Sequence, residues 1–357
     1  MLVFIRLDQI WMYAVQWFLI AAVVQAYCLW LLWQGLTQNH RENEDDLFTN
    51  FGLANKLTLT RGLMISLMAG FLFSPWPEGG LGWVPGLLYG GAIIIDYFDG
   101  YCARLTDRVT ILGGKLDMDF DSLGMFLVTS LAVWYGQLPW PFFILGIAYY
   151  LFVFGLAWRK RKGRSVKDLQ PSFHRRLFAG FLMVFMSITL LPILSPLIVT
   201  TIGSVFGVSL GLGFWRDWLV VSDRLDPYSP SYRKYQQRVF TLVTKWLPLL
   251  LRLMLGVMLI IIYRQLLPHV YGYFEPTAFV QGAYGFGLAL VAITTVFGIV
   301  GRVSAIFVLL VGVTDGLLTG ASLTMIITLL SASTILLYGS GYFAVWQPYE
   351  KTFAVRL

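Results

Sequence analysis

The chain has 357 residues, of which 57% are hydrophobic, 16% aromatic and only 13% charged, and its mean hydropathy is +0.71. Since an average soluble domain carries about 25% charged residues, this composition excludes an ordinary soluble protein and predicts a polytopic membrane protein. The formal net charge is +7, but Lys and Arg fall in short loops between apolar runs, a distribution typical of membrane topology and not of nucleic-acid binding.

The N-terminal apolar run covers about residues 10–36 and is followed by the acidic stretch NHRENEDD. It is too long for the apolar part of a signal peptide, which is roughly 7 to 15 residues. We therefore expect residues 1–46 to form a retained transmembrane helix and an acidic loop. The segment 37–57 is polar and then amphipathic, so we expect it to lie along the inner surface of the membrane before the next span.

Ten further apolar runs are long enough to cross a bilayer, which takes roughly 20 residues. We expect six of them to form a core within residues 47–225 and four to form a C-terminal membrane domain at 246–357, joined by a basic, Pro- and Ser-containing linker at 226–245. The predicted fold class is therefore all-α and polytopic, with one extra transmembrane helix before a six-helix core and about four after it. The ten expected spans lie at about 58–76, 82–104, 114–134, 139–158, 177–195, 197–221, 246–266, 277–298, 303–319 and 322–344.

Basic residues in the loops indicate the orientation of the chain. The segment 159–176 carries eight Lys or Arg and the segment 222–238 carries four, whereas the loops 74–83, 135–141 and 268–276 carry none. Because Lys and Arg concentrate in cytoplasmic loops, both basic segments are predicted to be cytoplasmic. The same alternation predicts an N-terminus outside, a C-terminus inside, and a cytoplasmic opening between the third and fourth spans.

Aspartates cluster at that opening, in DYFDGYCARLTDRVTILGGKLDMDFDSLG (96–124), where six of 29 residues are Asp. An unpaired carboxylate near hydrocarbon is costly, so acids at the mouth of membrane helices indicate a functional site. At about 100° per residue, Asp96 and Asp99 share one helix face, and Asp117 and Asp121 share another. Four carboxylates that converge repel one another unless a cation lies among them. Oxygen ligands without nearby Cys or His favour Mg²⁺, Mn²⁺ or Ca²⁺.

The alternative is that these acids only form ion pairs with the neighbouring basic residues Arg104, Arg108 and Lys115. For a single aspartate the two interpretations are about equally good. Two ordered pairs with Gly and Arg between them favour a metal site. Asp119 is turned about 160° from the face of Asp117 and is expected to lie outside it.

The four C-terminal runs carry no comparable motif, and we expect their domain to pack on the core or regulate it. Asp315 is conspicuous because it lies within an apolar run. An acid in this position is either a polar site or a residue that caps or pairs locally, and the sequence leaves both possibilities open.

The aspartate cluster resembles the motif D-x2-D-G-x2-A-R-x8-G-x3-D-x3-D of the CDP-alcohol phosphotransferase (CDP-alcohol phosphatidyltransferase) family. A second likeness is ANKLTLTRG, which is similar to the N-x2-T-x2-R motif before the first core helix of many members. A weaker one is FWRDWLVVSDRL (214–225), similar to a segment of the phosphatidylglycerolphosphate-synthase branch, so that the resemblance covers about residues 47–225. The matching residues are Asp96, Asp99, Gly100, Ala103, Arg104, Gly113, Asp117 and Asp121 in the first motif and Asn55, Thr58 and Arg61 in the second.

The resemblance implies an enzyme of phospholipid biosynthesis. It would transfer a phosphatidyl or related phospho-alcohol group from a CDP-linked lipid such as CDP-diacylglycerol to an acceptor hydroxyl, with release of CMP. Two divalent cations, Mg²⁺ or Mn²⁺, would lie near the cytoplasmic face, held by Asp96, Asp99 and Asp117 with a contribution from Asp121. Asp121 would also be the base that takes the hydroxyl proton. Membrane lipids would surround the protein, a homodimer is implied, and nucleic acid is not an expected partner.

The resemblance also assigns residues to the two substrates. One set of residues would either bind the donor or support the aspartates that hold the metal. These residues are Gly100, Ala103, Arg104, Gly113, Asn55, Thr58 and Arg61. The acceptor is not determined. If it carries a phosphate, the expected binding residues are Arg216, within the last core span, and Lys167, Arg175 and Arg176 of the basic loop.

Three other functions remain as alternatives. A Mg²⁺-dependent membrane prenyltransferase also uses aspartates on diphosphates, but draws them from widely separated parts of the chain. A divalent-cation transporter would need polar residues that continue through the spans, and few occur below the cluster. A binding protein that kept the fold and lost catalysis is disfavoured only because all four motif acids are present.

Overall fold

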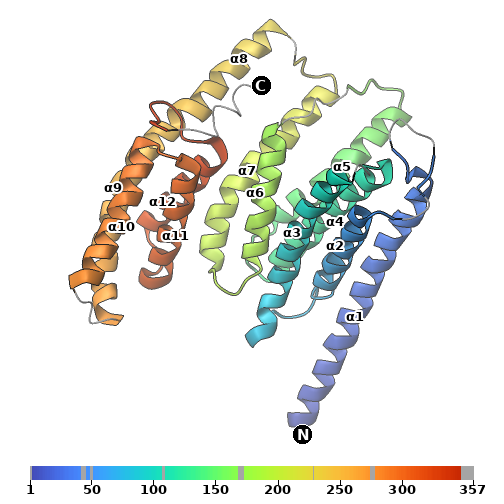
Figure 1. The fold of residues 1–357 in the computed structure, drawn as a ribbon, viewed down its shortest axis with the longest axis horizontal. Helices are drawn as coiled ribbons and strands as arrows, with labels where there is room; N and C mark the ends of the chain where they lie inside the picture. The colour runs from blue at the N-terminus through green and yellow to red at the C-terminus, as the bar shows by residue number, and fades with distance from the viewer. Residues whose placement is uncertain are drawn as a thin grey trace. The chain divides into compact units, whose positions relative to one another are not determined.

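A computed structural model describes residues 2–41, 46–48, 51–106, 109–167, 173–227, 229–273 and 278–346. Within these ranges every extended regular element is a helix, which confirms the all-α class (Figure 1). Each of the eleven apolar runs has a helix at its position. The bounds are α1 (Leu2–Gly35), η1 (Leu36–Gln38), α2 (Leu53–Ala69), η2 (Gly79–Trp83), α3 (Val84–Leu105), α4 (Ile111–Trp134), α5 (Pro141–Arg161), α6 (Phe173–Thr189), α7 (Pro196–Val221), α8 (Pro230–Thr241), η3 (Leu242–Trp246), α9 (Leu247–Tyr273), α10 (Ala278–Phe297), α11 (Gly301–Thr319) and α12 (Leu323–Tyr338).

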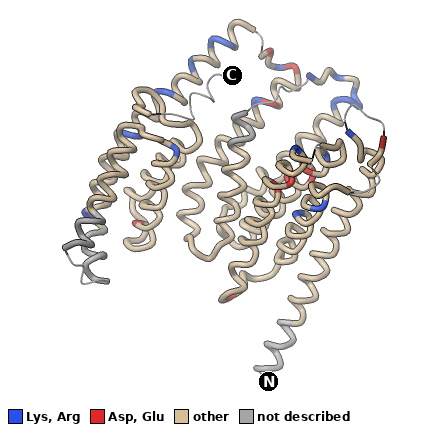
Figure 2. Tube along the Cα trace, viewed as in Figure 1, with Lys and Arg blue, Asp and Glu red and all other residues tan. Residues whose placement is uncertain are grey.

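Among the described residues, six stretches of helix are long and apolar enough to cross a membrane, and most of these residues carry no charge (Figure 2). Three shorter apolar helices accompany them, while α2 and α4 are not in either set. Those two helices carry Arg61 and the second pair of aspartates, which lower their mean hydropathy. The six candidate spans are Trp11–Gln38, Gly79–Leu105, Pro141–Arg161, Pro196–Val221, Pro230–Gln265 and Gly301–Thr319.

Two local predictions differ from the structure. Residues 53–57, expected in a segment along the membrane surface, form the first turn of α2. Burial of Asn55, Thr58 and Arg61 against polar partners explains why this polar stretch lies inside the bundle. The expected linker 226–245 is helical from Pro230 to Trp246, because proline suits the first position of a helix and Ser229 caps its N-terminus by accepting from the Tyr232 amide at 3.3 Å.

The chain divides into two compact units, which are described separately. The first comprises Met1–Phe154 and Leu182–Ile193, and the second comprises Gly155–Phe181 and Leu194–Leu357. The domain boundaries expected at residues 46, 225 and 245 remain predictions.

In the first unit α2 is the central helix, because it packs against α1, α3 and α4. Small residues allow these close approaches. A Cβ at Gly62 would lie 2.8 Å from the Phe120 ring of α4. The Ser187 hydroxyl of α6 donates to the Gly86 carbonyl of α3 at 2.9 Å, so residues 182–193 pack on α3 and close this unit.

In the second unit α12 packs against α7, α9 and α11. The Tyr338 hydroxyl at the end of α12 lies 2.9 Å from the Ser209 hydroxyl of α7. Asp315 is fully buried and lies within hydrogen-bond distance of the hydroxyls of Thr319, at 3.2 Å, and Ser322, at 3.5 Å. These contacts are local to the end of α11 and the start of α12.

Candidate active site

The site lies in the first unit, where the C-terminal part of α3 and the first turns of α4 approach α2. The Thr110 hydroxyl begins α4 by accepting from the Gly113 amide at 3.0 Å. A Cβ at Gly113 would lie 3.1 Å from Oδ1 of Asn55, so glycine allows the start of α4 to come close to α2. This approach places the aspartates of α4 opposite those of α3.

Three carboxylates from the two helices converge. Asp96, Asp99 and Asp117 each offer an oxygen atom, and these atoms all lie within 4.8 Å of one another. Asp99 is buried, while the side chains of Asp96 and Asp117 are 31% and 47% exposed. Among the described residues, this is the group of acids with a spacing suited to a metal ion.

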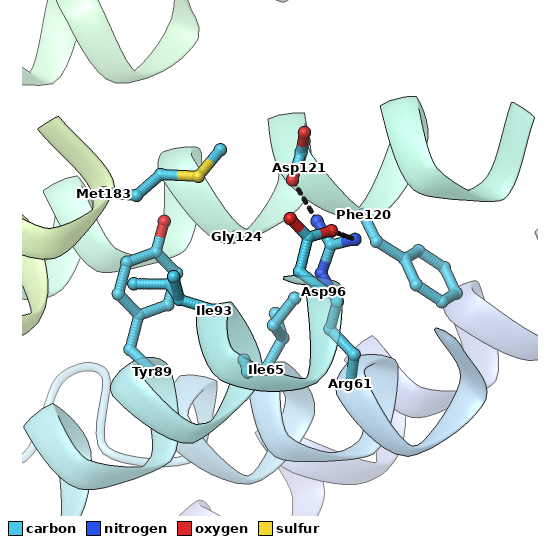
Figure 3. Close-up of a pocket in the computed structure, with 10 residues that line it drawn as sticks. Arg61, Ile65, Tyr89, Ile93, Asp96, Phe120, Asp121, Gly124 and Met183 are labelled. Carbon is cyan, nitrogen blue, oxygen red and sulfur yellow. Dashed lines mark hydrogen bonds and ion pairs between the residues drawn. The ribbon is translucent and has the colours of Figure 1, made fainter. Parts of the chain in front are cut away.

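The guanidinium of Arg61 lies among the carboxylates. Its Nη1 donates to Asp117 Oδ1 at 2.8 Å. Nη1 also donates to Asp96, and Nη2 donates to Asp121 (Figure 3). The Arg61 side chain is only 4% exposed, and α2 delivers it from about 35 residues before Asp96 in the sequence. One guanidinium carries a single positive charge against four carboxyl groups, so a further cation is needed to neutralise the cluster when all four are ionised.

Two other residues of the second motif also have partners in the site. The Thr58 hydroxyl donates to Asp99 Oδ2 at 2.8 Å, which orients this buried carboxylate. Asn55 donates through Nδ2 to Asn39 Oδ1 at 3.2 Å, so its amide joins α2 to the segment that follows η1. Thr58 and Arg61 therefore contact the acids directly, and their role toward the donor diphosphate remains a prediction.

The remaining motif residues lie on α3. A Cβ at Gly100 would be 3.4 Å from Nη1 of Arg104, so the long side chain lies over the glycine. Arg104 is exposed and forms no ion pair with a described residue, while Ala103 is half-buried. The exposed guanidinium of Arg104 on this part of α3 is therefore able to bind an external anion.

The residues predicted to hold an acceptor phosphate belong to the second unit. Lys167 Nζ lies 2.6 Å from Asp223 Oδ1, and this hydrogen bond raises the pKa of Lys167 and lowers the pKa of Asp223. Arg216 donates to the Tyr232 hydroxyl at 3.0 Å and lies 3.5 Å from Asp217. The side chains of Arg175 and Arg176 lie outside the described residues. A role for these four in acceptor binding remains a prediction.

A pocket adjoins the acids and was not predicted from the sequence. Asp96 and Asp121 line it together with Tyr89 of α3 and Met183 of α6 (Figure 3). Tyr89 precedes Asp96 by seven residues, which is close to two helical turns, so the two share a face of α3. That spacing is the sequence signal that could have singled out Tyr89.

A family model described as CDP-alcohol phosphatidyltransferase matches residues 51–215, which include α2, α3, α4 and both motifs. This region is therefore similar to CDP-alcohol phosphatidyltransferases over nearly half of the chain. No curated protein and no solved structure matches the chain.

The acids of the matched region fit the divalent cations that the CDP-alcohol phosphatidyltransferase family uses. All three convergent ligands are carboxylate oxygens, which suit Mg²⁺ and Mn²⁺ and do not suit softer metals. The Thr58 hydroxyl donates a hydrogen bond to Asp99. Hydrogen bonds from residues around a metal site commonly orient the metal ligands in this way. Asp121 is not part of the convergent group but contacts the same guanidinium as two of its members.

Proposed function

We propose that this protein transfers a phosphatidyl or related phospho-alcohol group from a CDP-linked lipid to an acceptor hydroxyl and releases CMP. The observation that carries the proposal is the convergence of Asp96, Asp99 and Asp117 within 4.8 Å, at a helix junction inside the region that matches the CDP-alcohol phosphatidyltransferase family. A prenyltransferase or a cation transporter would not need this family motif.

Asp96, Asp99 and Asp117 would hold Mg²⁺ or Mn²⁺, with two ions expected by family resemblance. When bound, such ions neutralise a diphosphate and make its phosphorus more open to attack. The exposed edges of Asp96 and Asp117 leave part of their oxygens accessible from outside the bundle. Arg61 and Thr58 keep the carboxylates in place from the α2 side.

Asp121 is the proposed base. In the reaction the acceptor oxygen forms a new bond to the phosphorus, the bond from phosphorus to the CMP oxygen breaks, and the hydroxyl proton passes to Asp121. The Nη2 of Arg61 orients one oxygen of this carboxylate, and a side-chain exposure of 36% leaves room for an acceptor. General-base assistance of this kind is typically worth about 10² to 10⁴ in rate.

Gly100 and Ala103 give α3 a surface without bulk, against which the cytidine nucleotide would lie, and Arg104 would contact its diphosphate. CDP-diacylglycerol or a similar lipid is the proposed donor. Lys167, Arg216 and the basic loop would bind a phosphate on the acceptor, if it has one. The loop charges support a cytoplasmic active site, and a homodimer is expected by resemblance.

The experiment that tests the proposal measures CMP release from CDP-diacylglycerol by the purified protein. Each reaction contains Mg²⁺, Mn²⁺ or a chelator, and a panel of acceptor alcohols is compared. Asp121→Asn should lose activity, whereas Asp119→Asn, on the opposite face of α4, is the matched control. Release that needs metal and Asp121 supports the function; no release with any acceptor, despite folded protein and bound Mn²⁺, would contradict it.

A further inference from the structure

The helix α8 is amphipathic, and none of its residues is buried. Tyr235, Val239 and Leu242, the residue that follows the helix, are separated by four and three positions, so their side chains share a face. Tyr235 is 66% exposed and Leu242 is 58% exposed. The Tyr232 hydroxyl of the same helix accepts from Nε of Arg216 in α7 at 3.0 Å, which holds α8 to α7. The helix therefore presents apolar side chains that the described part of the chain leaves exposed.

Basic residues flank this apolar face. Lys234 and Arg238 are about one helical turn apart, are exposed, and form no ion pair with a described residue. The helical stretch Pro230–Gln265 contains no Asp or Glu, and Figure 2 shows basic residues spaced along α8. Long basic side chains beside an apolar face can lay their stems along it and keep their charges in water. The two sides of α8 thus complement a surface that is apolar inside and anionic outside.

The continuous helical stretch Pro230–Gln265 is too long to lie wholly within hydrocarbon. Its 36 residues extend about 54 Å, because an α-helix rises about 1.5 Å per residue, whereas the hydrocarbon core is about 30 Å thick. The π-helical turn Leu242–Trp246 separates α8 from α9, and turns of this kind commonly bend helices. In Figure 1, α8 runs at an angle to α9. The helix α8 can therefore lie along the membrane surface while α9 crosses the membrane.

Aromatic residues next to the end of α8 support this position. The rings of Trp246 and Tyr342 pack edge to face with centroids 5.4 Å apart, and Lys245 Nζ lies 4.9 Å from the centroid of the Tyr342 ring. The Tyr342 amide donates to the Lys245 carbonyl at 3.1 Å, which fixes the segment after α12 at this point. The neighbouring Phe343 is 79% exposed. Because Trp and Tyr are enriched at the boundary between hydrocarbon and headgroups, this cluster indicates that the turn after α8 lies at that boundary.

We propose that α8 lies in the headgroup layer of the membrane and binds anionic phospholipids there. Tyr235 and Val239 contact acyl chains, while Lys234 and Arg238 contact lipid phosphates from the flank of the helix. Helices with an apolar face and a basic polar side bind in this plane, and basic residues beside a membrane attract its anionic lipids. The site lies outside the acid cluster, so it does not depend on the proposed transfer reaction.

The test follows a fluorophore on a single cysteine of the full-length protein in phosphatidylcholine bilayers. Cys28→Ser and Cys102→Ser remove the native thiols, and Val239→Cys or Gln237→Cys introduces the labelled position. These two positions lie about 160° apart around α8. A nitroxide on the upper acyl chain of a lipid quenches a label in the membrane, whereas acrylamide quenches a label in water. Quenching by the same nitroxide on phosphatidylglycerol and on phosphatidylcholine is compared at Val239→Cys.

The label at Val239→Cys should be quenched by lipid and protected from acrylamide, and the label at Gln237→Cys should show the reverse. Phosphatidylglycerol should quench at least about fivefold more than phosphatidylcholine, which is the effect of one basic side chain near an anionic surface. This preference should disappear at about 1 M ionic strength, where the Debye length is about 3 Å. Equal lipid quenching at the two positions would overturn the proposal. Protection of both labels from both quenchers would also overturn it, because a protein surface would then cover the helix.

Substitutions of charge test the lipid preference separately. Lys234→Gln combined with Arg238→Gln should bring quenching by the two lipids close to equal. The matched control, Lys160→Gln combined with Arg161→Gln, removes the same two charges from the exposed end of α5 and should leave the preference unchanged. An undiminished preference in the α8 variant would overturn the role of its basic residues. An equal fall in the control would assign the preference to the net charge of the protein and overturn a site on α8.

Discussion

Replacement of Arg61 by Met should make the stability of the first unit depend on divalent metal. The substitution keeps the apolar stem and removes the charge that contacts Asp96, Asp117 and Asp121. Removal of one partner from a buried ion pair typically costs about 3 to 5 kcal/mol. Because these carboxylates are 31% to 47% exposed and partly screened by solvent, the lower end applies, about 3 kcal/mol.

A divalent cation should restore much of this loss, because it neutralises the same carboxylates. A ligand that binds only the folded state at about 100 times its Kd contributes about 2.7 kcal/mol. For a unit of this size a change of 3 kcal/mol corresponds to a shift of about 6 to 12 °C in the unfolding midpoint. We therefore expect Arg61→Met to unfold about that much earlier than wild type in EDTA and to recover most of the difference in excess Mn²⁺.

The assay is thermal unfolding of the purified protein in detergent micelles, with EDTA or Mn²⁺, followed by intrinsic fluorescence. Arg104→Met is the matched control, because Arg104 is exposed on α3 and forms no ion pair with a described residue. Its midpoint should stay within about 2 °C of wild type, as for most surface substitutions. An unchanged midpoint for Arg61→Met in EDTA would refute the claim that its guanidinium stabilises the acids, and a lowered midpoint unaffected by Mn²⁺ would refute the metal site.

Three further substitutions test other parts of the site. Asp121→Asn should reduce kcat by about 10² to 10⁴ while Mn²⁺ still binds, since the group lost is the base; steady-state CMP release and electron paramagnetic resonance of Mn²⁺ measure the two effects. Thr58→Val should weaken Mn²⁺ binding by about 10- to 100-fold, because it removes the hydrogen bond that orients a buried ligand, and a Mn²⁺ titration measures it. Gly62→Val should destabilise the protein by about 1 to 3 kcal/mol, because its side chain would overlap the aromatic ring packed there, as denaturant unfolding would show.

Each of these predictions has a result that opposes it. Undiminished kcat in Asp121→Asn would remove the residue from the role of base, and equal loss in Asp119→Asn would attribute the effect to charge alone. If Thr58→Val binds Mn²⁺ with wild-type affinity, the hydrogen bond from Thr58 is not needed to orient Asp99 for metal binding. A stable Gly62→Val protein would mean that α2 and α4 separate more easily than their close contact indicates.

The sequence made the acid cluster predictable because its determinants are local. The pairs Asp96–Asp99 and Asp117–Asp121 follow helical spacing, and Gly113 and Gly114 lie in the first turn of α4, just after the short junction from α3. Long apolar runs similarly predicted the helices, since a span must satisfy its backbone hydrogen bonds within itself. The helix α8 was missed because Pro, Ser and basic residues are as typical of a linker as of a helix start.

The partners of the cluster depend on contacts between distant segments. Arg61 could be expected near the site from a motif, but its place among three carboxylates depends on how closely α2 packs on α3 and α4, which small residues at the helix contacts permit. Tyr89 carries no motif; its spacing from Asp96 indicates only a shared helix face, and its burial and its place in the pocket come from the structure. The sequence alone thus identified the acids of the site, because their spacing along each of two helices is local. The tertiary structure decided that Arg61 and the Tyr89 hydroxyl lie beside them, because side-chain neighbours across a bundle are set by packing.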